Sequence, residues 1–139
     1  MSRIVSIDYG HKRVGIAIAD PLLIFAQPIG TFSPDIAVKT LEKLHAAEGI
    51  STAVIGWPLL PDGSEGKATE AVTAYINRLS KRLPGAVFVK WDERYSSSEA
   101  RDRIKAGPEP SLKKSGKGRI DVVAAGIILE DYLEASRPS

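Results

Sequence analysis

The sequence predicts an α/β fold in which a mixed five-stranded sheet is flanked by helices. The first third of the chain holds three β-branched runs separated by short breaks, a pattern typical of an antiparallel meander. From residue 34 onward, helical and strand patterns alternate, which indicates parallel strands covered by helices. The 139 residues are enough for one core of ordinary size, so we expect a single domain over residues 1–139.

The first two strands are predicted to form a hairpin. Residues 3–8 and 13–20 are apolar runs separated by a four-residue break that contains Gly10. A third run, residues 25–32, follows the breaker Pro21. Short apolar runs bounded by turn residues are the usual mark of strands joined in sequence order, so these three runs make up the predicted meander.

The first helix is predicted over residues 34–48. Ser33 is a suitable N-cap residue, and Pro34 follows it at the first helical position. An apolar stripe runs from Ile36 to Leu44 at helical spacing, and Gly49 ends the pattern.

The remaining pattern alternates strand and helix up to a final helix. The predicted strands are residues 52–56 and 86–91, and the predicted helices are residues 68–83, 96–106 and 120–135. A loop is predicted between the last two helices, over residues 107–118, because this stretch holds three glycines, two prolines and three lysines.

The composition excludes several classes of protein and of site. The chain is 43% hydrophobic and 26% charged, which is typical of a globular domain. It has no cysteine, so disulfides, thiolate nucleophiles and cysteine-bound zinc are excluded. The two histidines lie far apart in the sequence, so we expect any metal to be held by oxygen atoms. No apolar run reaches the roughly 20 residues of a membrane helix, and we expect a cytoplasmic protein.

Positive charge is concentrated in one segment. The net charge is only +2, but residues 101–119 contain seven lysines or arginines and two acids. Such a segment creates a positive field that attracts phosphate groups. A solvated basic loop is the alternative interpretation.

Acids end two of the predicted strands. Asp8 shares one strand face with Ile4 and Ser6 and lies at the carboxyl end of the first strand. The strand over residues 86–91 runs directly into Asp92 and Glu93. Because ligands gather at the carboxyl ends of strands in open α/β sheets, we expect Asp8 and one of these two acids to lie near each other.

A third acid begins the last predicted helix. Asp121 is predicted to lie on the same helix face as Ala125, Ile128 and Tyr132. The alternative explanation for Asp121 is an acid near the helix N-terminus that the helix dipole stabilises. Three clustered carboxylates repel one another by about 3 kcal/mol per pair at ~5 Å and an effective dielectric constant of ~20. One or two divalent cations, Mg²⁺ or Mn²⁺, turn this repulsion into attraction. Two such ions promote hydrolysis of a phosphodiester, so the acids indicate a nuclease.

Four segments carry a resemblance to a known family. DYGHKRVG, GWPLLPDGSEG, WDERYSS and KGRIDVVAAGIILEDYL occur in this order between Asp8 and Leu133. They resemble the signature blocks of the YqgF family, also called RuvX or pre-16S rRNA nuclease. The resemblance implies a ribonuclease H-like fold related to the RuvC Holliday junction resolvases. It also implies a hydrolase of ester bonds that processes the 5′ end of pre-16S rRNA in ribosome biogenesis.

The resemblance further implies which residues form the site. The catalytic and metal-binding acids fall on Asp8, Glu93 and Asp121, with Asp92 as an alternative ligand to Glu93. The residues implied to bind nucleic acid are Lys12, Arg13, Arg94, Lys113, Lys114, Lys117 and Arg119. For the first two of these, an exposed turn without a binding role is the alternative. Trp57 either stacks on a base or packs in the core.

Three other functions stay open from the sequence. DYGHKRVG also resembles the phosphate-binding hairpin of actin-like ATP-binding proteins, although these close two such domains around a nucleotide and 139 residues supply one. A Holliday junction resolvase would act on branched DNA and would favour a homodimer over a monomer. A non-cleaving factor would bind nucleic acid in ribosome assembly or transcription. The expected partners are precursor rRNA or branched DNA, with ribosomal particles as further candidates and no membrane.

Overall fold

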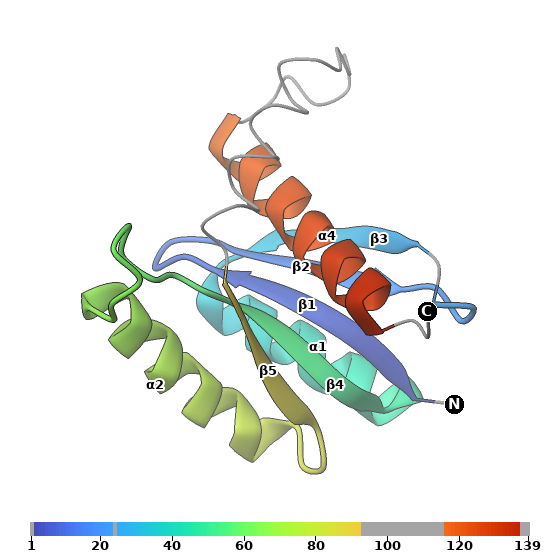
Figure 1. Cartoon of the computed structure of the whole chain (residues 1–139). Coiled ribbons are helices and arrows are strands. Elements are labelled where there is room, and N and C mark those ends of the chain that lie inside the picture. Colours follow the sequence, from blue (N-terminus) through green and yellow to red (C-terminus); the bar gives the residue numbers. More distant parts are fainter. Residues whose placement is uncertain (1, 24, 93–115, 137–139) are drawn as a thin grey trace.

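The computed structural model of the chain describes residues 2–23, 25–92 and 116–136. Its centre is a five-stranded sheet with the order β3-β2-β1-β4-β5 (Figure 1). β1 pairs antiparallel with β2, and β2 antiparallel with β3, whereas β1–β4 and β4–β5 are parallel pairs. The predicted mixed sheet is therefore confirmed, with strands β1 (Arg3–Tyr9), β2 (Val14–Ala19), β3 (Ala26–Phe32), β4 (Ile50–Trp57) and β5 (Val87–Asp92).

Helices cover both faces of this sheet. α1 (Pro34–Glu48) and α2 (Lys67–Arg82) lie against one face, and α4 (Gly116–Ser136) crosses the other (Figure 1). We call these the α1/α2 face and the α4 face. No helix in the described ranges has the length and apolar character needed to cross a membrane.

The start and end of α1 follow from local chemistry. The Ser33 hydroxyl accepts a hydrogen bond from the Ile36 N–H at 3.3 Å, which satisfies one of the free donors of the first turn. Gly49 ends the helix with a φ of 80°, and its N–H donates to the His45 carbonyl. A φ in the left-handed region favours glycine. The predicted helix over residues 34–48 is confirmed, with Ser33 as its N-cap and Gly49 at its end.

The larger hydrophobic cluster lies on the α1/α2 face. Ile7, Ile16 and Ile55 contribute to it from three strands, and Leu41 and Leu79 from the two helices, all of them fully buried. The cluster on the α4 face is made of smaller side chains: Ala17, Ala19, Ala125, Leu129 and Leu133. Among the side chains that the structure describes, the α1/α2 face therefore has the larger hydrophobic cluster.

The last helix begins earlier than the sequence predicts. α4 starts at Gly116, so residues 116–118 are helical rather than part of the predicted loop. A glycine in a helix costs only about 1 kcal/mol relative to alanine, which the hydrogen bonds of a long helix offset. The first turn of α4 holds no acid, because Asp121 comes in the second turn. The predicted helix over residues 96–106 and the first part of the loop lie outside the described residues.

Candidate active site

Asp8 lies near the carboxyl end of β1, on the α4 face. Val5 and Ile7 belong to the cluster on the α1/α2 face. Ser6 points the other way, where its hydroxyl donates a hydrogen bond to the Ala125 carbonyl of α4 at 2.6 Å. Because side chains alternate along a strand, Asp8 shares the face of Ser6, as the sequence predicts.

The strands on both sides of Asp8 carry glycine at its level. Asp8 pairs with Gly15 of β2. The register that pairs Ile7 with Ile55 of β4 brings Gly56 next to Asp8. Neither neighbouring strand therefore sends a side chain onto the α4 face beside this carboxylate.

The helix α4 runs antiparallel to β1 across this face (Figure 1). The contact of Ser6 with Ala125 fixes how the two elements are aligned. Asp8 is two residues beyond Ser6, about 7 Å along the strand. Position 121 is four residues before Ala125, about 6 Å along the helix in the same direction. Only the backbone of residues 116–123 is described, so Lys117, Arg119 and Asp121 are placed as helix positions.

The residues at the end of β5 divide between the two faces. Lys90 places its ammonium 4.1 Å from the centre of the Trp57 ring, on the α1/α2 face. The next side chain, Trp91, meets Tyr132 of α4 edge to face, with ring centres 5.9 Å apart. Because side chains alternate along a strand, Asp92 shares the α1/α2 face with Lys90, whereas Asp8 lies on the α4 face.

Glu93, Arg94, Lys113 and Lys114 lie outside the described residues. Among the side chains that the structure does describe, no three acids or histidines come together as a metal-binding group.

The β1–β2 hairpin carries two of the expected basic residues, which follow Asp8 in the sequence. The Gly10 N–H donates to the Arg13 carbonyl at 2.9 Å, which closes the turn. A Cβ atom at Gly10 would lie 2.7 Å from that carbonyl oxygen, so the turn requires glycine. Lys12 is exposed and Arg13 is half-buried.

Trp57 packs in the core. Only 8% of its surface is exposed, and the ammonium of Lys90 lies over its ring. Of the two interpretations of this residue, packing is therefore confirmed, because the ring has no free face broad enough for a base.

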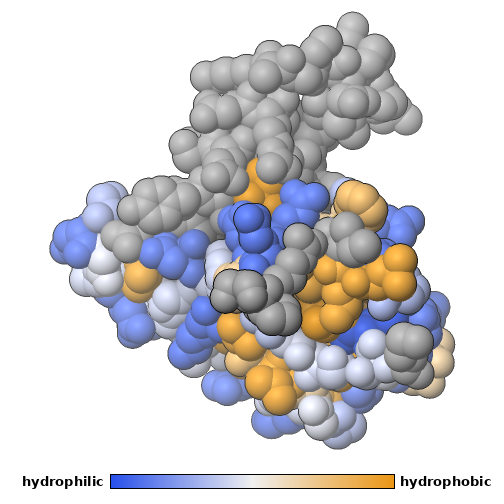
Figure 2. All heavy atoms as spheres, turned by 45° about the vertical axis from the view of Figure 1, so that its right-hand side comes forward, coloured by the Kyte–Doolittle hydropathy of each residue, from blue (hydrophilic) through white to orange (hydrophobic). Residues whose placement is uncertain are grey.

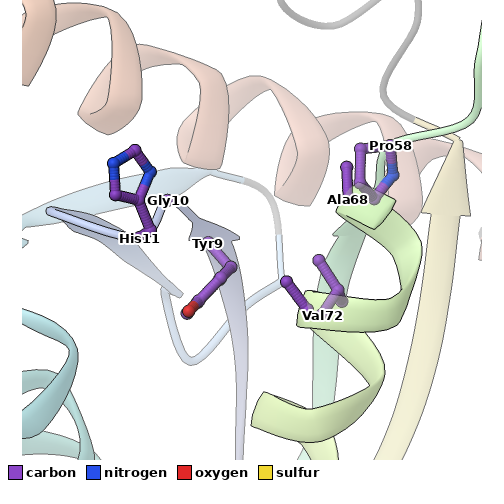
Figure 3. Close-up of a pocket in the computed structure, with 7 residues that line it drawn as sticks. Tyr9, Gly10, His11, Pro58, Ala68 and Val72 are labelled. Carbon is purple, nitrogen blue, oxygen red and sulfur yellow. The ribbon is translucent and has the colours of Figure 1, made fainter. Parts of the chain in front are cut away.

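A pocket that the sequence analysis does not predict lies beside the hairpin. This pocket of about 280 Å³ lies between the hairpin and the first turns of α2 (Figure 3). It is lined by Tyr9, Gly10, His11, Pro58, Ala68, Ala71 and Val72. Two alanines three residues apart on an otherwise polar helix surface were the available signal. Both alanines are exposed.

A pair of tyrosines fixes one wall of the pocket. The rings of Tyr9 and Tyr75 lie 4.5 Å apart between their centres. The Tyr75 hydroxyl donates to the Pro34 carbonyl at 2.9 Å. Burial raises the pKa of the Tyr75 phenol, so this group stays protonated and keeps its hydrogen bond. The Tyr9 ring thus rests on a partner that is itself anchored to α1.

The fold matches that of a solved RuvC structure. The structure of Thermus thermophilus RuvC in complex with a Holliday junction substrate aligns over 100% of both chains, with a TM-score of 0.60 and 7% sequence identity. At this identity the likeness shows the fold alone. The predicted ribonuclease H-like fold is confirmed.

Sequence relatives cover nearly the whole chain. A Salinibacter ruber protein named "Putative pre-16S rRNA nuclease" is 44% identical over 132 residues, which are 95% of this chain and 92% of the relative. A protein of the same name from Chlorobaculum tepidum is 38% identical over 133 residues, 96% of this chain and 94% of the relative. The family model described as RuvX, Holliday junction resolvase, matches residues 2–135. The chain therefore belongs to the RuvX family.

Proposed function

We propose that this protein is a metal-dependent nuclease, a hydrolase of ester bonds, that processes the 5′ end of pre-16S rRNA in the cytoplasm. The names of its relatives support the substrate. The observation that carries the chemistry is the position of Asp8. It lies at the carboxyl end of β1, between two glycines and on the face covered by α4. This is the edge where ligands bind in open α/β sheets.

The proposed metal ligands are Asp8, Glu93 and Asp121. Ser6 and Ala125 are hydrogen-bonded, and Asp8 and position 121 follow from them in the same direction along β1 and α4, which supports the proposed convergence. The parity of β5 supports Glu93 over Asp92, since Asp92 has the parity of the opposite face. Carboxylate oxygens are the ligands that Mg²⁺ and Mn²⁺ prefer, so the donor set fits one or two such ions. A bound divalent ion supplies an activated water and stabilises the leaving oxygen of a phosphodiester.

The basic residues of the chain would hold the polyanion at this edge. Lys12 and Arg13 follow Asp8 in the hairpin and are the proposed contacts to phosphates beside the acids. Arg94, Lys113, Lys114, Lys117 and Arg119 are the proposed contacts to the remaining backbone. Contacts of this kind fix the position of a nucleic acid without reading its sequence.

The experiment that tests this function compares wild type with Asp8→Asn. Purified protein with Mg²⁺ or Mn²⁺ is incubated in parallel with a precursor rRNA fragment and a four-way DNA junction. We expect wild type to cut the rRNA, and Asp8→Asn to lower the rate by at least about 100-fold because a metal ligand is lost. The two side chains have nearly the same shape, so the thermal unfolding curve should not change.

Glu134→Gln serves as the matched control, since it removes an exposed acid at the end of α4. Equal cleavage by Asp8→Asn and wild type would contradict the proposal. Cleavage of the DNA junction alone would favour a resolvase. Tight binding of either substrate without cleavage would favour a factor of ribosome assembly or transcription.

A further inference from the structure

We propose that the pocket between the β1–β2 hairpin and α2 binds one unpaired nucleobase of the nucleic acid that is cut at Asp8. This inference rests on the proposed nuclease function and adds to it a second binding site on the other face of the sheet. The pocket is the one lined by Tyr9, His11, Pro58, Ala68 and Ala71, with Val72 at its base (Figure 3).

The first argument is position. Asp8 and Tyr9 are consecutive residues of β1, so their side chains leave the strand on opposite faces. Asp8 faces α4, whereas Tyr9 packs against the cluster on the α1/α2 face and lines the pocket. Both residues lie at the carboxyl end of β1, so a nucleic-acid strand that passes around the hairpin from one face to the other would meet Asp8 and the pocket in succession.

The second argument is the chemistry of the walls. The hairpin supplies Tyr9 and His11 on one side, and Pro58, Ala68 and Val72 lie on the other (Figure 3). These are mostly apolar surfaces, and the histidine adds a ring nitrogen that can donate or accept a hydrogen bond. Single-stranded nucleic acids are commonly recognised by unstacked bases held against aromatic side chains and hydrogen-bonded at their edges.

The third argument is size. The volume of about 280 Å³ is just below the roughly 300–1,000 Å³ of pockets that enclose drug-sized ligands. One planar base fits such a space, but a whole nucleotide does not fit inside it. The short side chains of Ala68 and Ala71 create the space on the α2 side.

The fourth argument is charge around the pocket. Lys67 and Glu70 in the first turn of α2 have opposite charges, and the exposed Lys12 directly follows His11, which lines the pocket. A base inside the pocket leaves its phosphate outside, where the ammonium of Lys12 would attract it. This charge favours a nucleic acid over an apolar side chain of a protein partner.

The test measures the binding of single-stranded RNA that carries the sequence of the precursor rRNA cleavage site. Each RNA lacks one base, at a different position in each member of the series. Binding is followed by fluorescence anisotropy with Asp8→Asn protein, so that the RNA stays intact. We expect the loss of one particular base near the cleaved bond to weaken binding about 10-fold, as expected for the loss of one stacked base.

A second substitution assigns this effect to the pocket. Ala71→Phe, added to Asp8→Asn, fills the pocket and should make binding independent of that base. Ala74→Phe is the matched control, because Ala74 is exposed on the same helix and does not line the pocket. This control should retain the 10-fold effect, and circular dichroism checks that both variants fold.

The outcomes separate the two proposals. If Asp8→Asn cleaves as fast as wild type, the nuclease function proposed for this site is wrong. If Asp8→Asn blocks cleavage but no missing base weakens binding, only the base-binding role is wrong. The same conclusion holds if Ala71→Phe keeps the full effect of the missing base. The pocket would then remain a candidate for an apolar side chain of a protein partner.

Discussion

The two faces of the sheet use the same strands but different side chains. On the α1/α2 face, β1 contributes Val5 and Ile7 to a cluster that also contains large residues of both helices. On the α4 face, β1 contributes Ser6 and Asp8, the first bonded to α4 and the second at the strand end. One face has the larger of the hydrophobic clusters formed by described residues, whereas the other face has a carboxylate between two glycines.

This difference shows how the fold separates stability from chemistry. Alanines dominate the sheet side of the α4 cluster, and small side chains allow a helix to approach a sheet closely. The Ser6–Ala125 hydrogen bond then fixes the helix at a set level along β1. Residues of a site that sit on rigid elements are held more accurately than residues on loops.

The largest expected effect tests the unequal burial of the two faces. Leu41 and Leu129 are both fully buried, one on each face. Leu41→Ala should lower the free energy of unfolding by about 3–4 kcal/mol, because it opens a cavity among large neighbours. Leu129→Ala should lower it by about 2–3 kcal/mol, because the small cluster around it loses fewer contacts.

Urea denaturation followed by circular dichroism measures both values. A larger loss for Leu129→Ala than for Leu41→Ala would show that the α4 face is the more important one for stability.

The second prediction compares one hydroxyl on each face. Ser6 and Tyr75 each donate a hydrogen bond to a backbone carbonyl, at 2.6 and 2.9 Å. Ser6→Ala and Tyr75→Phe should each cost about 1 kcal/mol in thermal or urea unfolding. Only Ser6→Ala should also slow cleavage, by roughly 10-fold, because this bond joins β1 to α4, the helix that carries the proposed metal ligand Asp121.

Cleavage rates at saturating Mg²⁺, with Ser6→Thr as the variant that keeps a hydroxyl, check the second part. If Tyr75→Phe slowed cleavage as much as Ser6→Ala, the proposed division between the two faces would be wrong.

The smallest effect is expected in the β2–β3 connection, which belongs to neither packed face. This connection lies on the right-hand side of Figure 1, which is turned forward in Figure 2, where apolar side chains gather among hydrophilic ones. Leu22 and Phe25 are 77% and 66% exposed. The Asp20 carboxylate accepts hydrogen bonds from the N–H groups of both residues.

Leu23 has a φ of 58° in this connection, which is an unfavourable conformation for leucine. Leu23→Asn should therefore raise the free energy of unfolding by about 0.5–1 kcal/mol, because asparagine tolerates the left-handed region. Leu22→Asn is the control and should change it by less than about 0.5 kcal/mol. Equal responses in urea denaturation would mean that the conformation of Leu23 carries no cost.

Local patterns predicted much of the fold. The caps of α1 depend on neighbouring residues, so Ser33 and Gly49 were sufficient to place its ends. Side chains at the margin of a helix stripe were less predictable, because burial depends on where the helix lies on the sheet. Ile36 was expected in the apolar stripe of α1, but 47% of it is exposed, and the buried residues are Ala37, Val38 and Leu41.

The sequence by itself determined the alternation that sends Asp8 and Ile7 to opposite faces, because side-chain direction in a strand is a local property of the backbone. It also determined the meander, the crossovers and the family resemblance. Only the tertiary structure decided that Gly56 lies beside Asp8, and that Tyr9 and Ala71 share a pocket. These relations join residues far apart in the chain, and their distances depend on how whole elements pack against one another.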